Sequence, residues 1–159
     1  GKHIAPFRAD PAGVTRWIRP DAAAALLPTR PFARPRLAYR DVSGVGNRQT
    51  FIAAVVSAGV VTTHTLFCLR TPIPIDQQHF LCGLFNSSAL NAAVRMLMGG
   101  HVTTGLVEDL PVPLWTGSVD QRRIAELAAW LSDTEGSIES PVCRAALEEL
   151  DRLVWAIYA

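Results

Sequence analysis

Apolar and polar positions follow different patterns along the chain, and each pattern predicts an element. Residues 37–42 alternate apolar and polar side chains, as a half-buried strand does. Residues 51–56 and 60–69 are apolar at nearly every position, which is typical of central strands covered on both faces. Because Ser57, Ala58 and Gly59 separate these two runs, we expect a hairpin.

Helical spacing of apolar residues replaces the strand patterns after residue 75. We expect one helix through residues 80–85 that is capped by Asp76, and a second through residues 90–97 that is capped by Ser87 or Ser88. Gly99 and Gly100 end the second helix. Residues 101–105 are expected to be extended, and the proline-rich run 110–114 to be a stiff connector.

Two further helices are predicted near the C-terminus. Ser118 and Gln121 have the spacing of a capping box for the first, and Ser140 followed by Pro141 is a strong start for the second. Apolar residues recur in the second helix at four-three spacing, at Cys143, Leu147, Leu150, Val154 and Ile157. We favour an antiparallel hairpin of the two helices over an intermolecular coiled coil.

These elements predict an α/β (α+β) fold, in which a mixed β-sheet with flanking helices is followed by a C-terminal helical hairpin. Prolines break the first forty residues and leave room only for a short helix at residues 21–27. The connector at 110–114 predicts a domain boundary near Trp115, with domains at 1–115 and 116–159.

Composition restricts the class of protein. The chain has 159 residues, of which 49% are hydrophobic and 18% charged, enough for a globular core. The uncharged run 49–69 is interrupted by Ser57, Gly59 and His64, so we expect no membrane association. Three cysteines without a Cys-x-x-Cys pair favour a reducing cytoplasm. The missing initiator Met suggests a fragment of a longer parent.

The net charge of +1 conceals a strong asymmetry. Residues 1–50 contain nine Lys or Arg against three Asp, for a net charge of +6. Residues 101–159 contain four Arg against ten Asp or Glu, for a net charge of −6. Fourteen of the fifteen basic residues are Arg, whose planar fork suits phosphate and guanine. The basic third therefore predicts contact with a polyanion, unless the arginines reflect only GC-rich codons.

No catalytic constellation stands out. Two His/Cys pairs, His64 with Cys68 and His79 with Cys82, could in principle hold zinc, but a buried thiol and a core histidine explain the same residues. The only lysine is Lys2, which excludes a complete Asp…Glu-x-Lys nuclease centre, and a Gly-x-x-x-x-Gly-Lys phosphate loop is missing. The adjacent carboxylates at 108–109 and 148–149 have the pattern of solvated helix faces.

The order of several short motifs carries a resemblance. They are Gly1-Lys2-His3-Ile4, the run 36–42 (Arg-Leu-Ala-Tyr-Arg-Asp-Val), the run 47–54 (Asn-Arg-Gln-Thr-Phe-Ile-Ala-Ala), the run 80–87 with its Leu-Phe-Asn-Ser ending, and 102–105 leading into 110–113. In this order the chain resembles the TaqI-like C-terminal specificity domain of DNA adenine methyltransferases and type IIG restriction-modification enzymes. The match covers most of residues 1–131.

The resemblance implies a target recognition domain that binds double-stranded DNA in a prokaryotic cytoplasm. A catalytic domain of the same parent chain is then expected to bind S-adenosylmethionine, flip the adenine and methylate it. The fragment itself is expected to be no enzyme and to hold no cofactor or metal. The second half, with its Gln121-Arg122-Arg123-Ile124 run, also resembles type I specificity subunits. A lobe of such a subunit, or a protein-interaction module without a DNA role, remains an alternative.

Candidate contacts follow from the geometry of base edges and phosphates. Arg reads guanine and Asn or Gln reads adenine with paired hydrogen bonds, and a glycine-rich loop can enter a groove, so the base-reading candidates are Asn47, Arg48 and Gln49. The phosphate candidates are Lys2, His3, Arg36, Arg40, Thr50, Thr103 and Thr104. The alternative for each Arg is a solvated surface or an Asp partner, as for Arg40 beside Asp41. The acidic C-terminal helices are expected to be a spacer or a docking arm.

Overall fold

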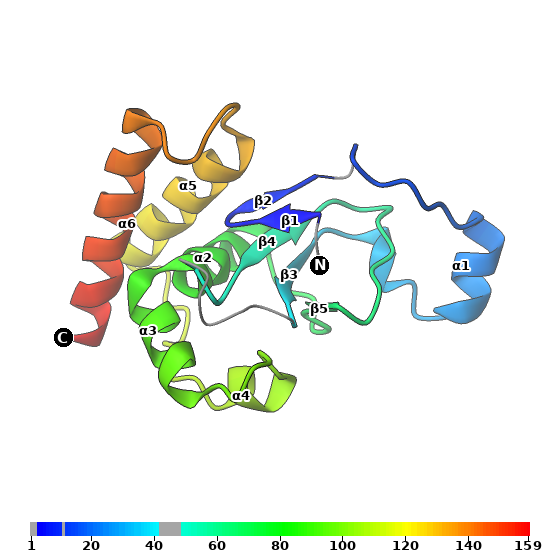
Figure 1. Ribbon diagram of the computed structural model, residues 1–159, viewed down its shortest axis with the longest axis horizontal. Helices are drawn as coiled ribbons and strands as arrows, with labels where there is room; N and C mark the ends of the chain where they lie inside the picture. The colour runs from blue at the N-terminus through cyan, green and yellow to red at the C-terminus, as the bar shows by residue number, and fades with distance from the viewer. Residues whose placement is uncertain (1–2, 11, 42–48) are drawn as a thin grey trace.

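The computed structural model describes residues 3–10, 12–41 and 49–159, and this part of the chain forms two small sheets and six α-helices (Figure 1). The strands are β1 (Ile4–Ala5), β2 (Arg8–Ala9), β3 (Arg36–Arg40), β4 (Ala53–Val56) and β5 (Leu66–Cys68). The helices are α1 (Pro20–Leu26), α2 (Ile75–Asn86), α3 (Ser88–Leu97), α4 (Thr104–Glu108), α5 (Val119–Asp133) and α6 (Pro141–Tyr158), with a 3-10 turn at Pro31–Ala33. The predicted mixed α/β class is confirmed.

The larger sheet has the strand order β4-β3-β5, and both pairings are antiparallel. The predicted hairpin between residues 51–56 and 60–69 is therefore wrong, because β4 and β5 each pair with β3 and not with each other. Within the described residues both sheets are antiparallel, and the parallel pairing is an isolated bridge between Phe7 and Ala54, so the expected single mixed sheet is not found.

Burial explains why β3 takes the centre. Its residues 36–39 are all buried, although their alternation predicted a strand with one wet face. Tyr39 packs against the rings of Phe51, Phe67 and Phe85, with ring centroids 5.6, 5.6 and 6.2 Å away. The opposite face of β3 is covered by Ile4 of the β1–β2 hairpin, which the sequence did not predict. The apolar β5 is only half-buried.

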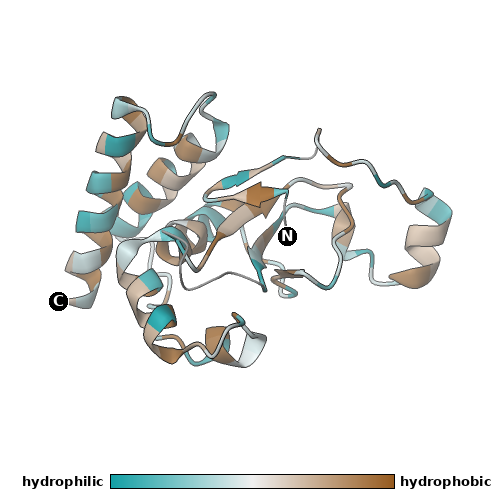
Figure 2. Cartoon of the chain, in the orientation of Figure 1, coloured by the Kyte–Doolittle hydropathy of each residue, from teal (hydrophilic) through white to brown (hydrophobic). Residues whose placement is uncertain are grey.

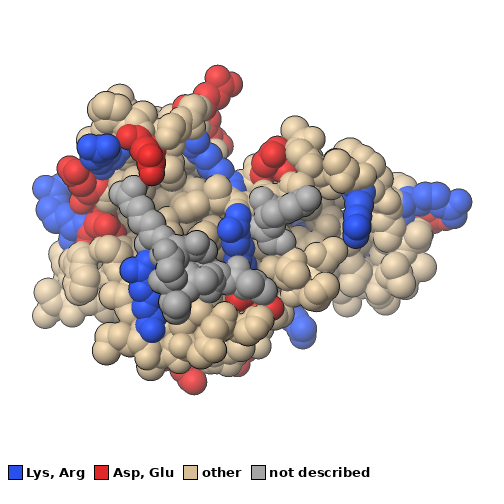
Figure 3. Space-filling view, viewed as in Figure 1, with Lys and Arg blue, Asp and Glu red and all other residues tan. Residues whose placement is uncertain are grey.

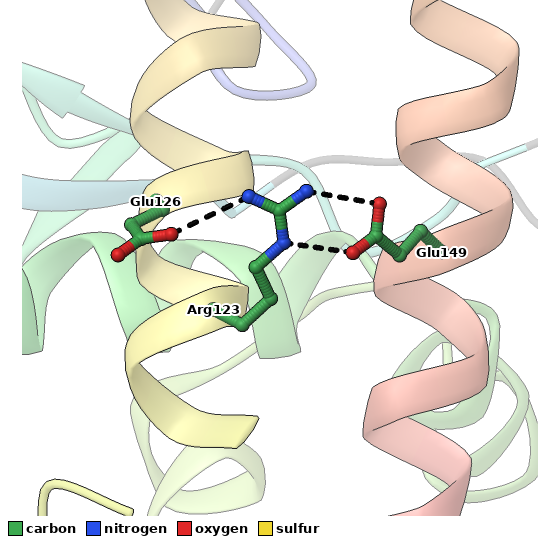
Figure 4. A network of polar contacts seen from close by, with 3 residues as sticks. All are labelled: Arg123, Glu126 and Glu149. Carbon is green, nitrogen blue, oxygen red and sulfur yellow. Dashed lines mark hydrogen bonds and ion pairs between the residues drawn. The ribbon is translucent and has the colours of Figure 1, made fainter. Parts of the chain in front are cut away.

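Helix α2 lies between the large sheet and α5, and α6 packs on α5 and α3. Gly83 allows the close approach of α2 to α5, because a Cβ at this position would lie 2.6 Å from Ile124 Cγ2. The α5–α6 pair is the predicted antiparallel hairpin, and Arg123 joins it through Glu149 at 2.7 Å (Figure 4). The pKa of Glu149 is lowered mainly by this hydrogen bond from Arg123.

Side-chain caps fix most helix starts where the sequence placed them. Ser87, Ser118 and Ser140 each accept a hydrogen bond from the backbone N–H three residues later. Asp76 is not the cap of α2, because the helix begins at Ile75 after Pro74 and Asp76 lies in its first turn. We also expected residues 101–105 to be extended, which is wrong for residues 104–105, because α4 begins at Thr104 with Thr103 as its cap.

One hydrophobic cluster runs through both predicted domains. It contains Leu37 and Phe80 from the first segment together with Ile124, Leu131 and Leu150 from the second. Residues 116–159 therefore share a core with residues 1–115. Helix α5 is part of that core, whereas a spacer or docking arm was expected. Among the described residues, no helix is long and apolar enough to cross a bilayer.

Candidate nucleic-acid interface

The two ends of the sequence-predicted reading loop are anchored to the core, although residues 42–48 themselves lie outside the described residues. On the near side, β3 runs up to Arg40, whose backbone N–H donates to the Ile52 carbonyl at 3.0 Å. Asp41 follows, and its carbonyl accepts from Val102 N at 2.9 Å. On the far side, the chain returns through Gln49 and Thr50 into β4.

The buried amide of Asn91, on α3, holds the returning segment. Its Oδ1 accepts from the backbone N–H groups of Thr50 and Phe51 at 2.9 and 2.8 Å. Its Nδ2 donates to the carbonyls of Ser87, Phe85 and Phe51 at 2.9, 3.1 and 3.3 Å. Two consecutive N–H groups share one acceptor and have no strand partner, so the backbone N–H groups of Thr50 and Phe51 depend on this side chain.

A second buried amide, Asn86, secures the start of β4 itself. Its Oδ1 accepts from Ala53 N at 3.1 Å, and its Nδ2 donates to the carbonyls of Ala53 and Cys82 at 2.8 and 2.9 Å. Asn86 ends α2 and Ser87 caps α3, so the Leu-Phe-Asn-Ser run is the corner between two helices that grips the neighbouring strand. Burial raises the pKa of the nearby Cys82 thiol to about 12, so this thiol stays protonated.

Arg40 marks the junction of the sheet with the N-terminal hairpin. Its guanidinium donates to the Ile4 carbonyl, and its Nε is buried with no hydrogen-bond partner. Burial lowers the pKa of Arg40 from its ordinary value. Arg40 is half-buried, and its side chain lines a groove beside the N-terminal hairpin.

A groove of about 770 Å³ opens beside these anchors, between the N-terminal hairpin, the α2–α3 corner and α6. Its basic residues are Arg40, Arg95 and Arg144, and its acidic residues are Glu139, Glu148 and Asp151. The acidic residues lie on or next to α6, whereas Arg40 and Arg95 lie on β3 and α3. The groove therefore has a basic wall and a mostly acidic one, which orients any charged ligand within it.

Arg95 connects the basic wall to the anchored segment. Its Nε donates to Thr50 Oγ1 at 2.9 Å. It lies four residues after Asn91, so both side chains leave the same face of α3. The sequence prediction did not include Arg95 and Arg144, because its arginine candidates all came from the basic first third of the chain. The i, i+4 spacing from Asn91 was a signal for Arg95.

The sequence-predicted residues fall into four groups: outside the described residues, half-buried, exposed and buried. Lys2, Asn47 and Arg48 lie outside the described residues. Gln49, Arg40 and His3 are half-buried, and Gln49 donates from Nε2 to the Asn86 carbonyl at 2.6 Å. Thr103 and Thr104 are exposed at the start of α4, but Thr103 Oγ1 accepts from Leu106 N as a helix cap.

Two of the phosphate candidates are structural in this fold. Arg36 is 4% exposed and donates to the Val60 carbonyl at 2.6 Å from the interior face of β3. Thr50 is fully buried under Asn91 and Arg95. Because both side chains are buried, neither can contact a phosphate, and we exclude both from the candidate interface. Segments distant in sequence bury them, so the local sequence did not reveal this.

The His/Cys pairs do not form a metal cluster within the described part of the chain, where no three His, Cys, Asp or Glu residues gather. His64 is exposed and Cys68 half-buried beside β5, whereas Cys82 is buried in α2. Burial lowers the pKa of His79 below its ordinary value, which favours the neutral imidazole of a core residue. Compared with protein-family models and with curated proteins, the chain gives no match.

Proposed function

We propose that this chain recognises double-stranded DNA on behalf of an adenine-specific DNA methyltransferase or type IIG restriction-modification enzyme, and that catalysis belongs to another domain of the parent. The observation that carries the proposal is the meeting of the separate motifs. Strand β3 of the run 36–42 pairs with β4 of the run 47–54, and Asn86, in the remote run 80–87, binds Ala53 of β4. Asn91 on α3 binds the backbone N–H of Thr50 in the run 47–54.

Anchoring of this kind is what base reading requires. Arg, Asn and Gln discriminate bases only when both hydrogen bonds of a pair are aligned, and misplacement of the backbone removes the second bond. The described residues before the segment, Arg40 and Asp41, and those after it, Gln49 and Thr50, are tied to the core. Between these fixed residues we propose Asn47, Arg48 and Gln49 as the base readers. In this proposal Asn86 and Asn91 position the base-reading residues in addition to stabilising the fold.

The charges indicate which side of the groove the duplex approaches. Phosphates favour the wall with Arg40 and Arg95, and are repelled by Glu148 and Asp151 on α6. We propose that the acidic helix faces the catalytic domain of the same parent, which would bind S-adenosylmethionine in a prokaryotic cytoplasm. His3, Thr103 and Thr104 stay secondary phosphate candidates.

The test is a map of adenine methylation in the genome of a host that carries the parent gene. The parent is compared as wild type, with Asn47→Ala or Arg48→Ala, and with Arg122→Ala as a control, because Arg122 is exposed on α5. We expect one sequence motif to lose methylation or to become degenerate at a position in the loop variants, and to persist in the control.

Other outcomes separate the parts of the proposal. If the motif persists unchanged in both loop variants at equal protein level, the loop does not read bases. If no motif depends on the gene, the methyltransferase function itself is wrong, and a protein-interaction module becomes the better explanation. A parent with two recognition lobes and no methyltransferase motif would make it a type I specificity subunit.

A further inference from the structure

Residues 12–35 form an extension that projects from the core and carries α1 at its far end (Figure 1). Only Ala23 of α1 is buried. Large apolar side chains are open to solvent on this extension: Trp17 is 87% exposed, Leu26 72% and Ile18 41% (Figure 2). Trp17, Ile18 and Leu26 thus put several large apolar side chains on the surface of one short extension, as is typical of a surface that a partner covers.

The same extension is basic. It contains Arg16, Arg19, Arg30 and Arg34 against Asp21, for a net charge of +3. Figure 3 shows more basic than acidic side chains at this end of the molecule. Arg19 is paired with Asp21 at 2.6 Å, and Arg34 donates to the Arg70 carbonyl at 2.6 Å.

Two arginines of the extension have no such role. The side chains of Arg16 and Arg30 are exposed and have no hydrogen-bond or ion-pair partner among the described residues. Arg16 directly precedes the exposed Trp17, in a segment without lysine. A guanidinium fork binds phosphate with two parallel hydrogen bonds, and an indole ring stacks on a base or wedges at a base step.

Charge and size favour duplex DNA over other occupants. A second copy of the chain in a symmetric contact would bring two +3 surfaces together, which is repulsive. A membrane surface is also anionic, but the only helix here has seven residues, too short for a stable amphipathic anchor. A neutral protein surface does not explain the excess of arginine.

We propose that the 12–35 extension is a second DNA contact, in which Arg16 and Arg30 bind phosphates and Trp17 packs against the sugar-base edge of the duplex. This inference rests on the proposed function. It adds a contact on the extension to the contacts proposed above for the core. The partner is the duplex backbone, so this contact adds affinity with little sequence preference.

Binding of the whole chain to a fluorescein-labelled duplex of mixed sequence, followed by anisotropy over a salt series, tests the inference. The variants are Arg16→Gln with Arg30→Gln, and Trp17→Ala; Arg122→Gln on α5 is the matched control. We expect the slope of log affinity against log salt to become shallower by about 0.9 for each arginine removed. Trp17→Ala is expected to weaken binding without changing that slope, because it removes no charge.

Folding does not obscure these results, because the replaced side chains are exposed and the thermal midpoint should not move. If the wild type binds duplex but the extension variants bind like the control, the extension is not a DNA contact, while the proposed function stands. If the wild type binds no duplex even at low salt, both fail. Binding to phosphatidylserine-phosphatidylcholine vesicles in place of duplex would also overturn the inference.

Discussion

Replacement of Asn91 by alanine is the sharpest test of the anchor that precedes β4. The side chain is 5% exposed and makes two acceptor and three donor contacts, all to backbone groups. In Asn91→Ala the N–H groups of Thr50 and Phe51 lose their acceptor, and both residues are fully buried. Each unsatisfied buried donor costs about 1–3 kcal/mol.

The expected loss is therefore about 2–6 kcal/mol, reduced if a water enters the space that the amide leaves. With a urea m-value of about 2 kcal/mol/M, a loss of about 3 kcal/mol lowers the unfolding midpoint by about 1.5 M. Urea unfolding followed by tryptophan fluorescence and far-UV circular dichroism gives both the midpoint and the m-value. The two probes should agree if unfolding is two-state.

Met96→Ala is the matched control, because Met96 lies on the same helix and is 86% exposed. Its free energy of unfolding should change by less than about 0.5 kcal/mol. A loss below about 1 kcal/mol in Asn91→Ala would refute the view that one amide fixes this segment. At a temperature where the variant is folded, we also expect weaker binding to duplex DNA, since the backbone N–H groups of Thr50 and Phe51 then lack their anchor.

Three further predictions test the core, the connector and the sheet. Gly83→Ala should destabilise the fold by about 1–3 kcal/mol in thermal unfolding, because its Cβ would lie 2.6 Å from Ile124 Cγ2. The control is Gly105→Ala on α4, which should be neutral or stabilising because its Cβ would meet nothing within 4 Å. Gln121→Ala should lower the thermal midpoint, because its amide caps the turn at residues 114–117 through four hydrogen bonds; an unchanged midpoint would contradict this. Burial raises the pKa of Tyr39 from 10.0 to about 12, so the stabilisation by the neutral phenol is complete below pH 10 and is lost as the pH rises towards 12. Tyr39→Phe should therefore lose less stability than the wild type between pH 10 and 12. Equal alkaline unfolding of the two proteins would contradict this prediction.

What the sequence determined by itself is mostly local. The short helix at α1, the starts of α3, α5 and α6 and the α5–α6 hairpin were predicted correctly. A helix satisfies its hydrogen bonds within four residues, and a serine cap acts within three, so the residues that decide these elements are neighbours in the chain.

Only the tertiary structure decided the order of the strands and the role of the polar core. Strand pairing joins residues far apart in sequence, and β3 became central because the N-terminal hairpin covers the face that its alternation left open. For the same reason Arg36 and Thr50 turned from candidate contacts into buried structure. Asn86 and Asn91 gained their importance from backbone groups 33 to 41 residues away, which no local pattern can reveal.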